Sequence, residues 1–179
     1  MRPSRPRPHP SRGATLLELL ASLAIVALLA AIALPSLRGL QDRIGADGVR
    51  MHLTASFAMA RSTAVTRRVA ISICPSEDGR HCGGEWTHGW MIYLDPHRKE
   101  HPGRAEDVLR YERPTSRTAT LQASATHGRQ RLRYTQDGRS IGTNLTVTIC
   151  VRKRIRGKVV ISNSGRVRSE VHHGNTPCP

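Results

Sequence analysis

The stretch that decides the fold is residues 14–34, ATLLELLASLAIVALLAAIAL, in which Glu18 is the single charged residue. A helix needs about 20 apolar residues to cross the hydrocarbon core of a bilayer, and this run has that length. A carboxylate inside a membrane helix costs about 2.5–3.5 kcal/mol on insertion scales, which makes Glu18 a candidate functional residue. The sequence therefore predicts a membrane-spanning helix with an acidic side chain near its start.

A short basic leader precedes this run. Residues 1–13, MRPSRPRPHPSRG, contain four arginines, four prolines and no acidic residue. The prolines prevent a regular helix or strand, and the arginines are expected to hold this end in the cytoplasm while the helix inserts. A secretory signal has its cleavage site after the apolar segment, whereas Gly13 comes before it. Cleavage after Gly13 would leave the apolar helix attached to the mature chain.

The order Gly13, Ala14, Glu18, apolar run and Pro35 resembles the class III signal of type IV pilins and pseudopilins. The resemblance implies that a prepilin peptidase cleaves between Gly13 and Ala14 and that the new amino terminus at Ala14 is N-methylated. The family usually has Phe at this first mature position, so the alanine departs from its pattern. Glu18 would then support filament assembly by pairing with the Ala14 amine of a neighbouring subunit, because two charges in lipid cost less when paired.

Positive charge is concentrated late in the chain. The 179 residues have a formal net charge of +15, and removal of the leader arginines leaves +11. Between residues 129 and 170 there are eleven lysines and arginines, against only Asp137 and Glu170. Such a field favours a polyanion, with nucleic acid or an anionic surface such as lipopolysaccharide as the alternatives. A solvated basic surface without a ligand is the third interpretation.

The chain has four cysteines, and an even number in a translocated domain indicates disulfides. Of the three possible pairings we favour Cys74–Cys82, which closes a short loop, with Cys150–Cys178, which would pin the C-terminal tail to a strand. Zinc is the alternative, but the chain has no CxxC pair, and the two histidines at 172–173 lie in a Gly/Pro-containing tail. We therefore predict neither a metal site nor a cofactor.

The pattern along the chain predicts an α+β fold, with a long N-terminal helix packed on one or two antiparallel sheets. The expected organisation is a prepilin leader, a transmembrane helix half, a second helix half, a β-rich domain and a tail, at 1–13, 14–35, 36–67, 68–171 and 172–179. Short β-like runs separated by turn residues are expected at 69–73, 90–95, 108–111, 118–124, 131–135, 145–151, 158–162 and 166–171.

The body of the chain resembles the GspH/FimT family of minor pilins and pseudopilins. The fragments that carry this resemblance are ARSTAVTRR (60–68), ICPSEDGRHC (73–82), WTHGWMIYLD (86–95), VLRY (108–111) and VVISNSGRVR (159–168). The resemblance implies a type IV pilin-like fold, other major and minor pilins as partners, and no enzymatic activity. It also implies an inner-membrane protein with a periplasmic domain, which later joins a pilus.

Residues 165–168, Gly-Arg-Val-Arg, match a Gly-Arg-x-Arg motif that is associated with DNA binding in FimT-like proteins of naturally transformable bacteria. Gly165 permits a tight turn, and in a strand Arg166 and Arg168 point to the same face, about 7 Å apart. That is close to the phosphate spacing of one DNA strand. A second basic cluster is expected near a hairpin tip, either extending this surface or guarding an edge: Arg152, Lys153, Arg154, Arg156 and Lys158.

The leading prediction is a minor pilin of a type IV pilus that binds DNA without sequence specificity and supports its uptake in natural transformation. The alternative is a type II secretion pseudopilin, or a pilus-priming subunit, without DNA binding. Trp86 and Trp90 are expected to be core or loop anchors more readily than base-stacking platforms. No Ser/His/Asp arrangement or carboxylate pair indicates catalysis.

Overall fold

A computed structural model describes residues 15–114, 116, 119–125, 130–142 and 144–178 of the chain. The predicted cleavage site, Gly13 and Ala14, lies outside these residues. Contacts divide the chain into two compact units, Met1–Gly39 and Leu40–Pro179.

The helix α1 runs from Leu16 to Arg67, which confirms the single long helix predicted from the sequence. Thr15 precedes it, and the N–H of Glu18 donates to Thr15 Oγ1 at 3.3 Å, as at a helix N-cap. In the first unit the large apolar side chains between Leu16 and Leu34 are at least 50% exposed. An 18-residue window of α1 near the N-terminus has a mean hydropathy of 2.6, so this segment is long and apolar enough to cross a membrane.

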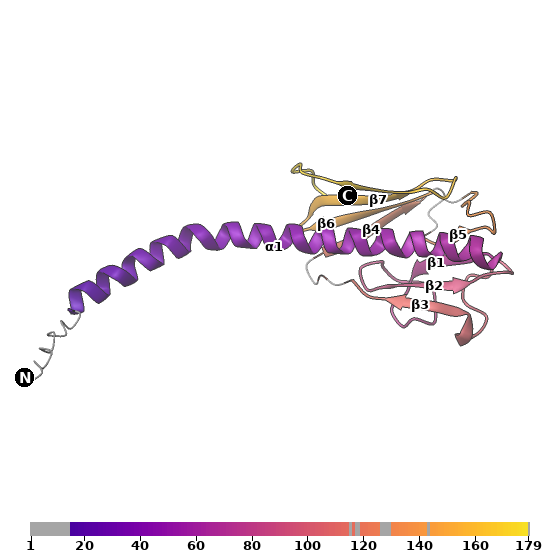
Figure 1. Cartoon of the computed structure of the whole chain (residues 1–179), viewed down its shortest axis with the longest axis horizontal. Helices are drawn as coiled ribbons and strands as arrows, with labels where there is room; N and C mark the ends of the chain where they lie inside the picture. The colour runs from indigo at the N-terminus through magenta and orange to yellow at the C-terminus, as the bar shows by residue number, and fades with distance from the viewer. Residues whose placement is uncertain (1–14, 115, 117–118, 126–129, 143, 179) are drawn as a thin grey trace, which may run out of the picture. The chain divides into compact units, whose positions relative to one another are not determined.

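The second unit contains two four-stranded antiparallel sheets, and Figure 1 shows them on either side of the helical segment within this unit. The first sheet has the order β3-β2-β1-β5 and the second the order β4-β6-β7-β8. The strand bounds are β1 Ile71–Pro75, β2 Trp90–Leu94, β3 Val108–Glu112, β4 Ala119–Ala125, β5 Leu132–Tyr134, β6 Leu145–Val151, β7 Arg154–Ile161 and β8 Val167–Val171. A short 3-10 helix, Ala105–Asp107, precedes β3.

The core of the second unit lies between α1 and the two sheets. One face of the helix is fully buried, at the three- and four-residue spacing of a single helical stripe: Val49, Leu53, Phe57, Ala60 and Ala64. These residues belong to one apolar cluster with the inward-facing side chains of both sheets. The helix and the sheets therefore share a single core.

Both tryptophans lie in this core, as predicted. Trp86 and Trp90 are 1% and 0% exposed, and their ring centroids are 6.4 Å apart. Trp90 Nε1 donates to Ser56 Oγ on α1 at 3.0 Å. The rings are therefore unavailable for stacking on the bases of a nucleic acid.

The structure corrects the expected start of β7. This strand begins at Arg154, four residues earlier than the predicted run 158–162. The β6–β7 connection is a tight turn whose two central residues, Arg152 and Lys153, have φ angles of 51° and 61°. Ile155 is buried at 6% exposure, so the hairpin continues through a segment whose many arginines make it resemble a loop.

The disulfides have the pairing that the sequence favoured. Cys74 is bonded to Cys82, with their Cα atoms 5.6 Å apart. Cys150 of β6 is bonded to Cys178, with a Cα–Cα distance of 6.3 Å. The second bond attaches the C-terminal tail to the second sheet.

Candidate nucleic-acid interface

The predicted arginine pair lies at the start of β8, which is an edge strand of the second sheet. Val167 packs against the core, so its neighbours Arg166 and Arg168 point to the opposite face. Both arginines are exposed. Among the residues that the structure describes, neither forms an ion pair. Their guanidinium groups are therefore available to an external anion.

Gly165 has two structural reasons to be glycine. Its φ angle is +77°, in the left-handed region that side chains disfavour, and its N–H donates to Ser162 O at 2.7 Å to close the predicted turn. A Cβ atom at this position would also clash with the carbonyl oxygen of Gly138. The turn before the arginine pair is thus packed backbone to backbone against another loop.

That second loop brings a third arginine to the site. The Cα atom of Arg139 lies 3.3 Å from the position that a Cβ on Gly165 would occupy, and the Arg139 side chain is exposed. The next residue, Ser140, is buried, and its Oγ donates to Ser162 O at 2.8 Å. We call Arg139, Gly165, Arg166 and Arg168 the turn-end cluster. In the sequence, Arg139 stands out only as one of the cations of the late basic excess.

The acidic residue of this loop is engaged in holding the backbone. The Asp137 carboxylate accepts a hydrogen bond from Thr135 Oγ1 and one from the N–H of Arg139 at 3.2 Å. These bonds, the first of them most strongly, hold the Asp137 pKa below its ordinary value. Arg61 of α1 donates from Nε to Gly138 O at 3.0 Å. The loop is therefore fixed both internally and to the helix.

The other predicted basic residues behave differently. Arg152, in the β6–β7 turn, forms an ion pair from its Nε to Asp42 Oδ2 of α1 at 2.8 Å. Arg154 donates from its guanidinium to Asn175 O at 3.3 Å. Lys153 is exposed. Part of the cluster is thus used to attach the hairpin to the helix and to the tail.

The strand register separates this hairpin tip from the turn-end cluster. Arg154 pairs with Val151 at one end of β7, and Ile161 pairs with Val167 at the other. Seven residues of strand correspond to about 23 Å. Lys158 lies between the two ends, opposite Glu170. The predicted DNA-binding residues are therefore spread along β7 and β8, with the hairpin tip at one end, the arginine pair at the other and Lys158 between them.

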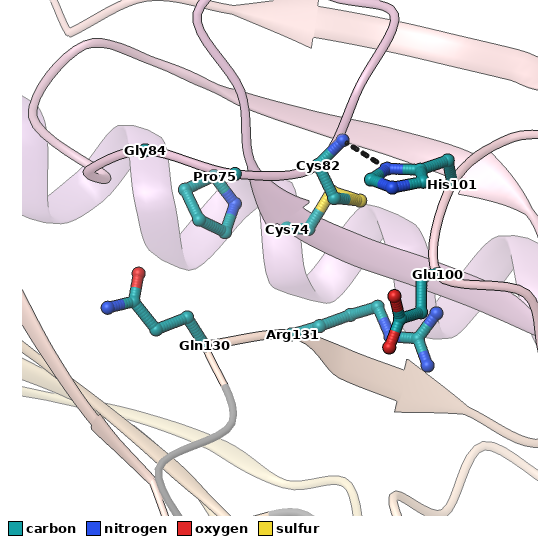
Figure 2. A pocket seen from close by; sticks show the side chains of 9 residues that line it. Cys74, Pro75, Cys82, Gly84, Glu100, His101, Gln130 and Arg131 are labelled. Carbon is teal, nitrogen blue, oxygen red and sulfur yellow. Dashed lines mark hydrogen bonds between the residues drawn. A yellow bond between two sulfur atoms is a disulfide. The ribbon is translucent and has the colours of Figure 1, made fainter.

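A cavity of about 660 Å³ lies beside the Cys74–Cys82 disulfide. Figure 2 shows Glu100, His101, Gln130 and Arg131 around it. The His101 ring accepts a hydrogen bond at Nδ1 from the N–H of Cys82 at 3.0 Å. This histidine therefore holds the disulfide loop.

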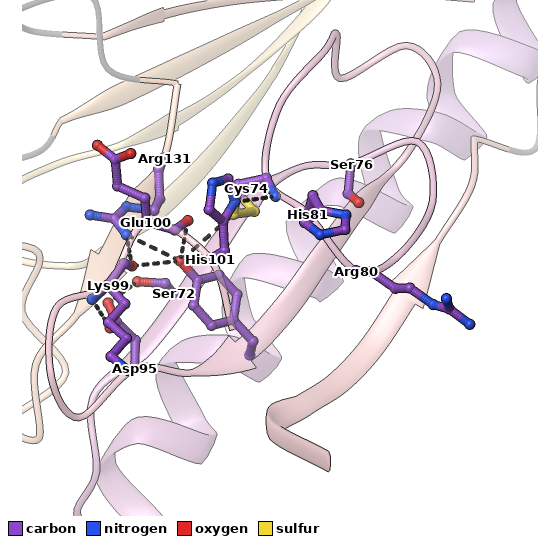
Figure 3. Close-up of a disulfide and its surroundings, with 12 residues drawn as sticks. Ser72, Cys74, Ser76, Arg80, His81, Asp95, Lys99, Glu100, His101 and Arg131 are labelled. Carbon is purple, nitrogen blue, oxygen red and sulfur yellow. Dashed lines mark hydrogen bonds between the residues drawn. A yellow bond between two sulfur atoms is a disulfide. The ribbon is translucent and has the colours of Figure 1, made fainter. Parts of the chain in front are cut away.

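The polar groups beside this cavity bond to one another. The Tyr93 hydroxyl lies 3.1 Å from the carbonyl oxygens of both Lys99 and Glu100, and it accepts a hydrogen bond from Arg131 at 3.1 Å. Figure 3 shows Lys99, Glu100 and Arg131 close to one another in this region. Burial raises the Tyr93 pKa. No group of three or more potential metal ligands occurs among the described residues. The cavity is thus stabilised by loop contacts, and the turn-end cluster is the better candidate site.

Comparisons with known proteins agree with this fold. Residues 51–165 match the family model described as type II transport protein GspH, and residues 9–34 match the prokaryotic N-terminal methylation motif. None of the curated proteins matches the chain in sequence.

Solved structures of pilin-like proteins share the fold. The Pseudomonas aeruginosa type IV minor pilin FimU is 24% identical, with a TM-score of 0.58 over 73% of this chain and 92% of that chain. The minor pseudopilin EpsH of the Vibrio cholerae type 2 secretion system is 10% identical, with a TM-score of 0.53 over 73% of this chain and 98% of that one.

Proposed function

The chain belongs to the GspH family of pilin-like proteins, and from that premise we propose that it is a DNA-binding minor pilin of a type IV pilus. Family membership and the methylation motif make it a minor pilin or pseudopilin of a type IV pilus or a type II secretion system. The finer proposal is that it contacts DNA through the turn-end cluster and supports DNA uptake in natural transformation.

The observation that carries the proposal is the exposure of Arg166 and Arg168 on a rigidly held edge strand, without ion-pair partners among the described residues. Arginine binds phosphate oxygens through two parallel hydrogen bonds. The cluster has no base-reading element such as a helix placed to enter a groove, so we expect contacts to the backbone alone, without sequence preference. Arg139, presented by the adjoining loop, adds a third cation.

The N-terminal part of the proposal concerns processing and assembly. We propose cleavage after Gly13, methylation of Ala14, and a periplasmic location of the second unit before the chain enters a filament. Glu18 is exposed and, within the described part of the chain, forms no ion pair. Its carboxylate is therefore available to the amino terminus of a neighbouring subunit, where pairing would reduce its cost in lipid.

The test is DNA binding by the mature full-length chain in neutral detergent, followed by the fluorescence anisotropy of a labelled duplex across a salt titration. Arg166→Gln together with Arg168→Gln should weaken binding about 10-fold or more at low salt. It should also reduce the slope of log affinity against log salt by about 2, because each lost phosphate contact lowers it by about 0.9. The matched control is Lys153→Gln with Arg154→Gln, which removes two cations at the other end of β7.

Equal affinity of the wild-type chain and the Arg166/Arg168 variant would show that the cluster does not bind DNA. The alternative function would then be favoured, a type II secretion pseudopilin or a pilus-priming subunit without DNA binding. A smaller loss in the Arg166/Arg168 variant than in the control would also contradict the proposal. Thermal unfolding of each variant establishes that exposed side chains were removed without loss of the fold.

A further inference from the structure

The hairpin tip and the parts of the second unit around it form a basic surface that DNA binding at the turn-end cluster leaves unexplained. Its residues come from α1, from the β6–β7 hairpin and from the C-terminal tail. We call this the hairpin-tip surface, and it comprises Arg43, Lys153, Arg154, Arg156, His172 and His173.

Part of this surface is a built cavity of a size suited to a small anion. It has a volume of about 120 Å³, and Arg43, Arg156, His172 and His173 are among the residues that line it. The Nε atom of Arg156 is buried and has no hydrogen-bond partner among the described residues. A buried donor without a partner is costly, and an anion in the cavity would relieve that cost.

The acidic residues near the surface already have partners. Asp47, which also lines the cavity, accepts hydrogen bonds from Arg50 Nε at 3.2 Å and from its terminal nitrogen at 3.1 Å. Asp42 is paired with Arg152. The remaining cations are therefore not neutralised locally, and the surface attracts negative charge.

The backbone conformation of the β6–β7 turn suits residues other than the arginine and lysine at its centre. Arg152 and Lys153 both have positive φ angles, and hairpin turns of this kind strongly prefer Asn-Gly or Asp-Gly at these positions. Non-glycine residues in the left-handed region carry a conformational cost, and such strain clusters at functional sites. The sequence thus retains two cations at the outermost point of the hairpin where uncharged residues would fit with less strain.

The length of the chain limits how far the anchor point of this surface can lie from the membrane segment. Asp42, which anchors the tip through Arg152, follows Leu34 by only eight residues. Eight residues rise about 12 Å in a helix and reach about 29 Å when fully extended. The polar layer on each side of a bilayer is about 5–7 Å thick, and long arginine side chains extend toward it.

We propose that the hairpin-tip surface binds the anionic phospholipid headgroups of the membrane in which residues 16–34 are anchored. Anionic lipids attract nearby arginines and lysines wherever they are present in a leaflet, and the cavity would accept one headgroup phosphate. DNA is the competing polyanion, but it is free in solution, whereas headgroups are held beside the surface at high effective concentration. The inference rests on the proposed membrane anchoring and is independent of DNA binding.

The experiment uses the mature full-length chain in nanodiscs of phosphatidylcholine alone, or of phosphatidylcholine mixed with anionic phosphatidylglycerol. Backbone hydrogen exchange is measured for residues 152–156 and 171–178. We expect these amides to exchange at least 3-fold more slowly in the anionic nanodiscs. The variant Lys153→Gln, Arg154→Gln and Arg156→Gln should lose that difference. Arg166→Gln with Arg168→Gln, the matched control at the other end of β7, should keep it.

Each outcome has a distinct meaning. Failure of the chain to enter nanodiscs would refute the proposed anchoring and, with it, the inference that rests on it. Equal exchange of the wild-type chain in both kinds of nanodisc, or the same slowing in the triple variant, would refute the inference. Stronger protection of the tip by a DNA duplex than by anionic lipid would assign the surface to nucleic acid instead. Unchanged protection of β6 in the triple variant establishes that it is folded.

Discussion

The two ends of β7 carry similar positive charge but hold it in different ways. At the hairpin tip, Arg152 is paired with Asp42 and the backbone adopts a strained turn. At the opposite end, the arginine side chains are without ion pairs among the described residues, and the backbone is fixed by the contact of Gly165 with Gly138. At the hairpin tip an ion pair holds one arginine side chain. At the turn end a backbone contact holds the strand, and its arginine side chains extend to solvent.

This difference shows that charge density by itself does not identify a binding site. The segment 152–158 contains more cations than the segment 165–168. Nevertheless, Arg152 has a structural partner, and Arg154 lies about 23 Å of strand away from the turn-end cluster. The two ends are distinguished by the ion pair that engages Arg152 at the tip and by the backbone contact that fixes the turn-end cluster.

The largest expected effect is a loss of stability when the disulfide near the hairpin tip is removed. Removal of the Cys150–Cys178 bond by Cys150→Ser with Cys178→Ser should lower the free energy of unfolding of the second unit by about 3–4 kcal/mol, because the bond closes a loop of 28 residues. DNA affinity should change much less. The measurement is a urea titration followed by the fluorescence of Trp86 and Trp90.

The matched control for this experiment is Cys74→Ser with Cys82→Ser. That bond spans only 8 residues, so the same chain-entropy estimate gives about 2–3 kcal/mol. A DNA affinity that falls in parallel with stability in the Cys150/Cys178 variant would show that the two ends of β7 are not independent.

A somewhat smaller effect is expected when the backbone contact at the turn end is disturbed. Gly165→Ala should lower the free energy of unfolding by about 2–4 kcal/mol, because it combines a left-handed φ angle with a clash against the Gly138 carbonyl. It should also weaken DNA binding although no charge is lost. Urea titration and anisotropy measure the two effects.

Gly142→Ala is the control for Gly165→Ala. Gly142 has a similar φ angle of +79°, but a Cβ atom there would meet nothing within 4 Å. Gly142→Ala should therefore lower the free energy of unfolding only by the cost of a left-handed backbone at alanine, about 1–2 kcal/mol. Equal destabilisation by the two substitutions would mean that the close approach of the loops contributes nothing.

The smallest expected effect is a pH dependence confined to the turn end. The Asp137 pKa is lowered from 3.8 by hydrogen bonds to its ionised carboxylate. The stabilisation by these hydrogen bonds is fully present at pH values above the pKa of Asp137 in the unfolded chain. It is lost as the pH falls below about 4 through the lower pKa of Asp137 in the folded chain. Hydrogen exchange at the N–H of Arg139 should accelerate over this range relative to its intrinsic rate.

Asp137→Asn should abolish that acceleration and leave the hairpin tip unaffected. An identical acid response in Asp137→Asn and in the wild-type chain would attribute the effect to a different carboxylate. The same measurement at Ile155, whose N–H donates to Thr176 O at 3.0 Å, gives the reference at the tip.

Much of the fold could be predicted because its signals are local. The run 14–34 is apolar throughout, and the strands β2 and β6 consist largely of β-branched, aromatic and apolar residues. Arg154–Gly157 was missed as part of β7 because its alternation places arginines outward and only Ile155 and Gly157 inward. Two inward residues, one of them glycine, are too few to distinguish a strand from a basic loop.

The candidate site was predicted only in part, because its geometry depends on distant contacts. The motif at 165–168 is contiguous and could be recognised directly. The approach of Gly138 to Gly165 joins loops on different sheets, and no sequence period connects them. The Asp-Gly pair at 137–138 indicates a turn but cannot show what that turn packs against, so Arg139 was not assigned to the site. The Asp42–Arg152 pair, 110 positions apart, is equally invisible.

The buried stripe of α1 has a consequence for how the turn-end cluster is assembled. Its side chains taper from Leu53 and Phe57 to Ala60 and Ala64. Leu53 and Phe57 fill more of the space between helix and sheets than the two alanines, which lie in the last turns of the helix. The loops on separate sheets meet beside these last turns, where Arg61 donates to Gly138 O, so we expect a larger side chain in place of either alanine to disturb how the arginines are brought together.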